Sequence, residues 1–200
     1  LEILYNNSQT ALVKNITNFS QSLLYKGYQV IELKENKTFF SNSTYLFNSQ
    51  TEVFDSTIAE ITSSINPDSI QFFIQSLQNF GTRYKFATTR DSVASWIRDQ
   101  FLSMGYSDAI LDSIYYENTW QKNVIATLPG NLEPDKINII GAHHDSYAYP
   151  DPMNYAPGAD DNGSGVAAVL EIARVLQEIN YTPKSTIKLI TWAAKEGSGD

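Results

Sequence analysis

The fold is decided by two stretches, Ile137-Asn-Ile-Ile-Gly-Ala-His-His-Asp145 and Thr186-Ile-Lys-Leu-Ile-Thr-Trp-Ala-Ala-Lys-Glu196. Each is apolar over the length of a strand and then ends in polar side chains. The residues from about Gly163 to Glu178 between them have helical spacing. Strands that are apolar throughout and joined through a helix indicate a sheet covered on both faces, with at least one parallel crossover. We therefore predict an α/β fold with a mainly parallel or mixed central sheet and helices on both faces.

Helical patterns precede these strands. Helical spacing begins near Ser56, a further helix is expected to start at Pro67, and a third should run from about Arg90 to Met104, before Gly105. Two strand-like stretches follow, at Ala109–Tyr116 and Lys122–Leu128. Residues 56–200 are accordingly predicted to be one α/β domain.

Residues 1–55 have a different pattern. They predict a strand at Leu1–Tyr5, an amphipathic helix at about Thr10–Tyr25, and strands at Tyr28–Leu33 and Thr38–Phe47. We interpret them as an accessory or pro-region-like segment. The alternative, that they add edge strands to the main sheet, is left open.

Composition bears on several classes of partner. The 200 residues include 14 basic and 22 acidic side chains, for a formal charge of −8, so we expect no nucleic-acid partner. There is no cysteine, so any metal site must use His, Asp and Glu. No run reaches the roughly 18 apolar residues of a membrane span, so we expect no membrane partner.

The acidic, cysteine-free composition and the start at Leu1 without Met favour a secreted or periplasmic protein. The oligomeric state is left open.

The residues with metal-binding chemistry stand where the predicted strands end. His143 follows the first strand and Glu196 follows the second, and ligands of open α/β sheets bind beyond the carboxyl ends of strands. Asp161 lies in the glycine-rich stretch Ala156–Gly165, just before the helix. One imidazole and two carboxylates suit Zn²⁺. Asp145, two residues after His143, is placed to accept the second N–H of that imidazole.

Each of these features also has an ordinary structural interpretation. A histidine at a strand end is commonly a hydrogen-bonded structural residue, an Asp-Asn-Gly turn before a helix is commonly a cap, and a glutamate after a strand is commonly solvated. Gly163-Ser-Gly165 lacks the spacing of a phosphate-binding loop. The occurrence of all three features in order, at the expected boundaries, favours the metal site.

The same stretches resemble a known family. Gly141–Ser146, Ala156–Gly165 and Ile187–Glu196 are similar to the successive signatures of the di-zinc aminopeptidases, metallopeptidase family twenty-eight, of the bacterial leucyl aminopeptidase type. Looser similarity extends back to about Ser56. The resemblance implies a phosphorylase/hydrolase-like zinc exopeptidase core, two zinc ions bridged by a carboxylate and a water, and release of amino-terminal residues from peptide substrates.

The resemblance also implies roles by position. His143 matches a ligand of one zinc, Asp161 the carboxylate that bridges both, and Glu196 a ligand of the other. Asp145 matches the residue that orients the ligand histidine. The Asp161–Asn162 peptide bond matches one that is cis in relatives.

Two departures from the family pattern affect activity. Lys195 occupies the position of the glutamate that serves as general base, and a protonated lysine cannot accept a proton. The downstream aspartate and histidine ligands of the family have no counterpart before Asp200. We therefore expect the amino-terminal part of such a domain, with weak or partial zinc occupancy. Two other functions stay open: a non-catalytic, aminopeptidase-like binding domain, which Lys195 favours, and a glutaminyl-cyclase-like activity around a single zinc.

Overall fold

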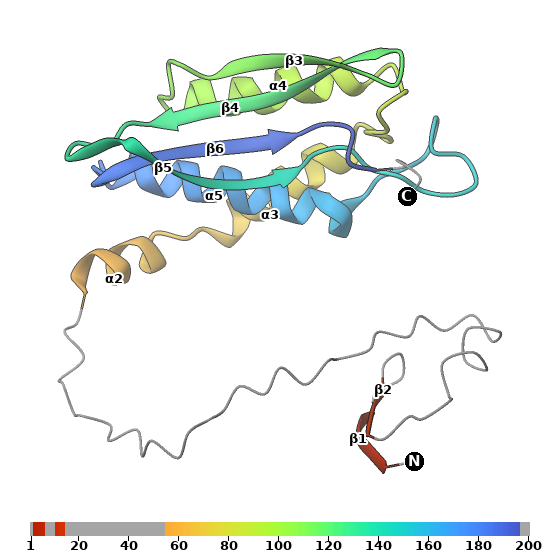
Figure 1. The fold of residues 1–200 in the computed structure, drawn as a ribbon, viewed down its shortest axis with the longest axis horizontal. Helices are drawn as coiled ribbons and strands as arrows, with labels where there is room; N and C mark the ends of the chain where they lie inside the picture. Colours follow the sequence, from red (N-terminus) through yellow and green to blue (C-terminus); the bar gives the residue numbers. More distant parts are fainter. Residues whose placement is uncertain (1, 7–10, 15–54, 197–200) are drawn as a thin grey trace. The chain divides into compact units, whose positions relative to one another are not determined.

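The computed structural model describes residues 2–6, 11–14 and 55–196 (Figure 1). The chain divides into two units, Leu1–Glu52 and Val53–Asp200. In the first, β1 (Glu2–Asn6) pairs antiparallel with β2 (Ala11–Lys14).

The predicted strand near the amino end is observed as β1. The helix predicted from about Thr10 is wrong over Ala11–Lys14, because these residues pair with β1. A helical spacing of apolar residues is a weak signal where a strand partner lies a few residues away. The remainder of that predicted helix and the two predicted strands that follow it lie outside the described residues.

The second unit is built on a mixed sheet. Its strands in the described residues are β3 (Ile110–Tyr116), β4 (Thr119–Leu128), β5 (Glu133–His143) and β6 (Ser185–Trp192), in the order β3-β4-β6-β5. β5 and β6 are parallel, whereas β4 is antiparallel to both of its neighbours. The parallel crossover predicted from the two apolar stretches is confirmed, and it runs through α5 (Gly165–Glu178).

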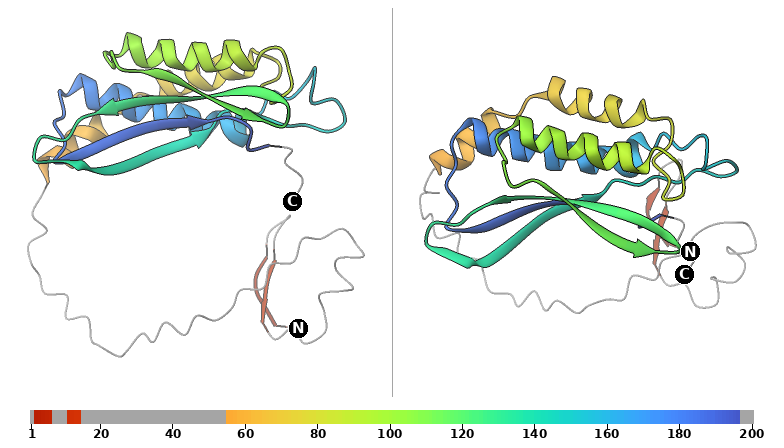
Figure 2. Two further views of the ribbon diagram at one scale, coloured as in Figure 1. Left: turned by 45° about the horizontal axis from the view of Figure 1, so that its top comes forward. Right: turned by 90° about the horizontal axis from the view of Figure 1, so that it is seen from above.

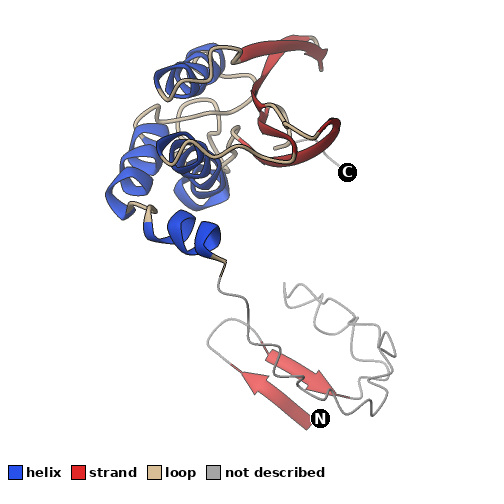
Figure 3. Ribbon diagram, turned by 90° about the vertical axis from the view of Figure 1, so that its left-hand side faces the viewer, coloured by secondary structure: helices blue, strands red, loops and turns tan. Residues whose placement is uncertain are grey.

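The helices of this unit lie on one side of the sheet. α3 (Pro67–Gln78), α4 (Arg90–Ser103) and α5 are layered over one face in both views of Figure 2 and in Figure 3, and the shorter α2 (Ser56–Ser63) precedes them. The sequence predicted helices on both faces; in the described part of the chain they cover one. Ile137 and Ile139 of β5 point to the other face and are 51% and 58% exposed. Among the described helices, none combines the length and apolarity needed to cross a bilayer.

The core lies between these helices and the sheet. Asn66 caps α3 by accepting a hydrogen bond from the Asp68 N–H, and Pro67 occupies the first turn. Fully buried apolar side chains from helices and strands then meet in one cluster, which includes Leu77, Ile97, Phe101, Val124, Leu170 and Leu189. This packing fixes the carboxyl ends of β5 and β6 relative to the amino end of α5.

A partly buried ion pair joins α5 to the turn before α3. Glu171 accepts hydrogen bonds from the Arg174 Nε (2.8 Å) and from the Asn66 N–H (2.6 Å), and Arg174 Nη2 donates to the Ser64 carbonyl (2.6 Å). Burial raises the pKa of Glu171, but the hydrogen bonds from Arg174 and Asn66 outweigh burial and hold that pKa below its ordinary value. The ionised glutamate therefore stabilises the fold.

We predict that Glu171→Gln lowers the free energy of unfolding by about 1.5–3 kcal/mol at neutral pH, the range for hydrogen bonds to charged groups. A carboxyl with a lowered folded-state pKa contributes stability above its unfolded pKa, near the ordinary glutamate value of 4.5, and loses it as the pH falls through the folded-state pKa. Urea denaturation at neutral and acidic pH should therefore show the deficit shrinking in acid.

Glu178→Gln is the matched control, because Glu178 contacts the same arginine but its side chain is 56% exposed. It should cost at most about 1 kcal/mol. A Glu171→Gln deficit that stays constant with pH would contradict the role of the ionised carboxylate.

Candidate metal centre

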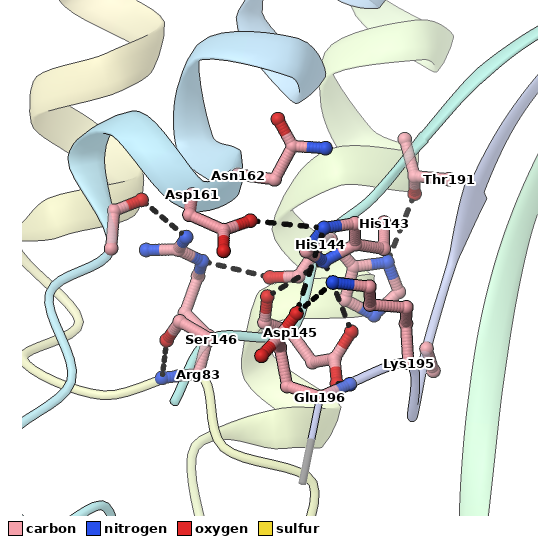
Figure 4. Close-up of polar contacts among 12 residues, drawn as sticks. Arg83, His143, His144, Asp145, Ser146, Asp161, Asn162, Thr191, Lys195 and Glu196 are labelled. Carbon is pink, nitrogen blue, oxygen red and sulfur yellow. Dashed lines mark hydrogen bonds and ion pairs between the residues drawn. The ribbon is translucent and has the colours of Figure 1, made fainter. Parts of the chain in front are cut away.

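The parallel pairing of β5 and β6 brings the predicted site residues to one edge of the sheet (Figure 4). His143, the last residue of β5, is the register partner of Trp192, the last residue of β6. Beyond Trp192 the chain turns at Ala194, whose φ of 60° is left-handed. This turn returns Glu196 toward β5, where its N–H donates to Asp145 Oδ2 at 2.7 Å.

Three side chains from separate segments converge here. His143, Asp161 and Glu196 each offer a ligand atom, and these atoms all lie within 4.8 Å of one another. His143 Nε2 is 3.1 Å from Asp161 Oδ1 and 3.9 Å from Glu196 Oε1. Two ligands of a tetrahedral zinc, each about 2.1 Å from the ion, are roughly 3.4 Å apart. The donor set and its spacing therefore fit zinc.

Asp145 supports two of these residues from beneath. The His143 Nδ1 lies 3.2 Å from the Asp145 carbonyl and 3.5 Å from its Oδ1, so an Nδ1–H tautomer donates toward Asp145 and leaves the Nε2 lone pair facing Asp161. The other carboxylate oxygen holds the Glu196 main chain. Asp145 is 2% exposed. Burial raises the pKa of its carboxyl, and hydrogen bonds from the Glu196 and Lys195 main chain oppose that rise.

Asp161 projects from the turn that leads into α5. This turn spans Ala159–Ser164 and is kinked, since the backbone at Asp161 and Asn162 is not helical. The Asp161–Asn162 peptide bond within it is cis, as the family resemblance predicted. The side chain of Asn162 accepts a hydrogen bond from the Gly165 N–H at 3.0 Å, at the start of α5. The Asp161 side chain is 70% exposed, so the convergence point is open to solvent.

Lys195 is also at the site. Its ammonium hydrogen-bonds Glu196 Oε1, the oxygen that faces His143. That hydrogen bond raises the pKa of Lys195. The residue at the general-base position of the family thus keeps its proton at neutral pH and cannot accept another.

Arg83 lies next to the site but is not among the site residues predicted from the sequence. Its guanidinium lies beneath the site and donates to the His144, Leu77, Pro157 and Gly158 carbonyls. Burial lowers the pKa of Arg83 to about 10, and the charges of Asp145 and Asp161 oppose that change, so the group stays protonated at neutral pH. The signal available in the sequence was Asn79–Arg83, part of the looser similarity to the family.

His144 fills the space on the core side. It is buried, and its Nδ1 lies 3.1 Å from Thr191 Oγ1. Burial, with a contribution from the positive charge of Arg83, lowers the pKa of His144 to about 3. This imidazole is therefore neutral and structural.

Comparisons with known proteins agree with this geometry. Residues 123–198 match the sequence model of Peptidase family M28. A probable zinc metalloprotease of Pyrenophora teres f. teres (strain 0-1) is 33% identical over 168 residues, covering 72% of this chain and 36% of that protein. Leucine aminopeptidase 1 of the same fungus is 32% identical over 155 residues, covering 72% of this chain and 39% of that protein.

A solved structure shares the fold. The crystal structure of LapB from Legionella pneumophila is similar with a TM-score of 0.60 and 27% identity, over 72% of this chain and 39% of that one. The chain thus spans well under half the length of the relatives it matches, between 36% and 39% for these three. Residues 123–198 thus match peptidase family M28 in sequence, and the fold of the chain agrees with that match.

Proposed function

We propose that this chain carries part of a zinc-dependent exopeptidase domain that releases amino-terminal residues from peptides. The observation that supports it most is the convergence of one imidazole nitrogen and two carboxylate oxygens at the carboxyl ends of β5 and β6. The names of the related fungal proteins, a probable zinc metalloprotease and a leucine aminopeptidase, agree with that chemistry.

In this proposal His143, Asp161 and Glu196 hold zinc. Zinc bound there would supply a Lewis acid for the scissile carbonyl and would activate water. Asp145 would keep the ligand histidine in its Nδ1–H tautomer and hold the Glu196 main chain in place. The family resemblance implies a second zinc, which needs ligands in addition to these three residues.

Lys195 decides how active such a site is. Its ammonium and a zinc ion compete for the same Glu196 oxygen, and it offers no proton acceptor. We therefore propose that the chain binds zinc weakly and turns substrate over slowly. Lys195 also favours the alternative of a non-catalytic binding domain, but the convergence of the three ligand atoms favours the enzyme.

Localisation belongs to the same proposal. We propose that the protein is secreted or periplasmic, on the basis of its acidic, cysteine-free composition. Fractionation of the native cells, followed by detection of the protein outside the cytoplasmic fraction, tests this.

Zinc binding is the first prediction from this proposal. Calorimetry should detect Zn²⁺ binding to the chain, and Asp161→Asn should weaken it by at least about tenfold because a ligand carboxylate is lost. Asp160→Asn is the matched control, since it removes the same charge from the adjacent exposed residue outside the cluster. Metal analysis after dialysis should find well below two zinc ions per chain; two tightly held ions would contradict weak occupancy.

Restoring a base at position 195 is the second prediction. With added Zn²⁺, hydrolysis of a leucyl chromogenic substrate should be about 10²–10⁴-fold faster in Lys195→Glu than in Lys195→Met, the usual contribution of a general base. Both variants remove the ammonium, so their difference isolates the added carboxylate.

Product analysis separates the competing functions. Release of a free amino-terminal residue supports the exopeptidase, whereas ammonia release from a peptide beginning with glutamine supports cyclase chemistry. If Lys195→Glu binds zinc but releases neither product above the zinc-free background, the enzyme proposal fails and the binding domain takes its place.

A further inference from the structure

We propose that Arg83 is a positioning residue, whose guanidinium fixes the spacing of the two ligand-bearing loops and thereby sets the zinc affinity. This inference rests on the proposed metal site. Arg83 acts through main-chain carbonyls and not by binding the metal.

The guanidinium joins three segments that are far apart in the sequence. Its Nε donates to the His144 carbonyl at 2.8 Å, Nη1 donates to Pro157 at 2.5 Å, and Nη2 donates to Gly158 at 2.8 Å. Nη1 also donates to the Leu77 carbonyl near the end of α3, at 3.2 Å. A single planar group therefore ties the loop after β5 and the loop before α5 to one helix.

These carbonyls stand next to the ligand residues. His144 lies between His143 and Asp145, so holding its carbonyl fixes the direction in which both flanking side chains leave the chain. Gly158 is three residues before Asp161, at the start of the turn that presents this carboxylate. A shift of either loop changes the distance from His143 Nε2 to Asp161 Oδ1, which is 3.1 Å.

The main chain at Gly158 packs closely against the Arg83 guanidinium. Gly158 has a left-handed φ of +49°, and a Cβ built there would lie 2.9 Å from Arg83 Nη2 and 2.6 Å from the Ser146 Cβ. Ser146 accepts a hydrogen bond from the Arg83 N–H at 3.0 Å and donates to the Ala156 carbonyl. Ser146 thus adds hydrogen bonds between the loop after β5, the loop before α5 and the main chain of Arg83.

Only an arginine satisfies this arrangement. Its five N–H donors form a rigid planar fork, whereas a lysine ammonium offers three donors at a single point. Arg83 is 1% exposed, and its hydrogen bonds to the His144 and Leu77 carbonyls are buried. A substitution would leave these carbonyls without a donor, which favours a shift of the loops.

Lys85 provides the matched comparison. It lies two residues after Arg83, in the same segment between α3 and α4, and is equally buried, at 1% exposed. Its ammonium is 2.6 Å from Glu117 Oε2 and lies over the Phe86 and Tyr116 rings, at 5.3 and 5.4 Å from their centroids. These contacts hold the β3–β4 turn, so a change at Lys85 tests general stability without touching the ligand loops.

The experiment measures zinc affinity and thermal stability together in the whole chain. Arg83→Lys should weaken Zn²⁺ binding by about 10–100-fold, as is usual for groups that orient metal ligands, and should alter the visible absorption bands of bound Co²⁺. Lys85→Met should lower the melting temperature but leave the zinc affinity and the Co²⁺ bands unchanged. Ethylguanidinium should restore part of the affinity lost in Arg83→Ala.

Ser146→Ala covers the case in which the arginine variants fail to fold. It removes one connection between the same loops and should give a smaller loss of zinc affinity with altered Co²⁺ bands. If Arg83→Lys folds and keeps the zinc affinity of the unmodified chain, the positioning role is overturned. If the arginine variants do not fold, an unchanged zinc affinity in Ser146→Ala overturns it. Either result leaves the proposed function intact. If the unmodified chain bound no Zn²⁺ through Asp161, the proposed function and this inference would both fail.

Discussion

Parallel pairing of β5 with β6 is the constraint on which the rest of the site depends. Parallel neighbours end at the same edge, and the register sets His143 beside Trp192. The next few residues of each strand therefore share one small region, whatever their own preferences. The crossover helix α5 begins at that edge too, so the turn before it brings Asp161 to the same place. Two strands and one helix amino end are enough to gather the three candidate ligands.

The acidic side chains at this edge of the sheet are balanced by nearby positive charges. Asp145, Asp161 and Glu196 stand within a few ångströms of His143, and like charges held so close are unfavourable without a cation. Arg83 supplies positive charge from the buried side, and Lys195 supplies it from the solvent side. A bound divalent ion would meet the same requirement more strongly, and in the proposed site it would compete with Lys195 for Glu196.

Much of this could be predicted from the sequence, because it depends on local patterns. The apolar runs of β5 and β6, the helix between them, and the polar residues at their ends are all contiguous signals. Arg83 could not be found in this way, since its partners are main-chain carbonyls of Leu77, His144 and Pro157, which any residue type presents. β2 was predicted to be helical for a related reason: pairing with β1, which lies outside the local pattern, outweighed the helical spacing of its apolar residues.

The distribution of burial separates the roles of the polar groups. Asp161 is largely exposed, whereas Asp145 and Arg83 are almost wholly buried beneath it. Burying a carboxylate and a guanidinium costs free energy that well-packed apolar side chains of similar size would not. Both buried groups form hydrogen bonds to main-chain atoms of, or close in sequence to, candidate ligands. A surface that only binds a partner does not require buried charged groups that hold its exposed side chains in place. A metal centre does, because its ligands must stay within a fraction of an ångström of one geometry. The buried charges beneath the exposed carboxylate therefore support the proposed metal site.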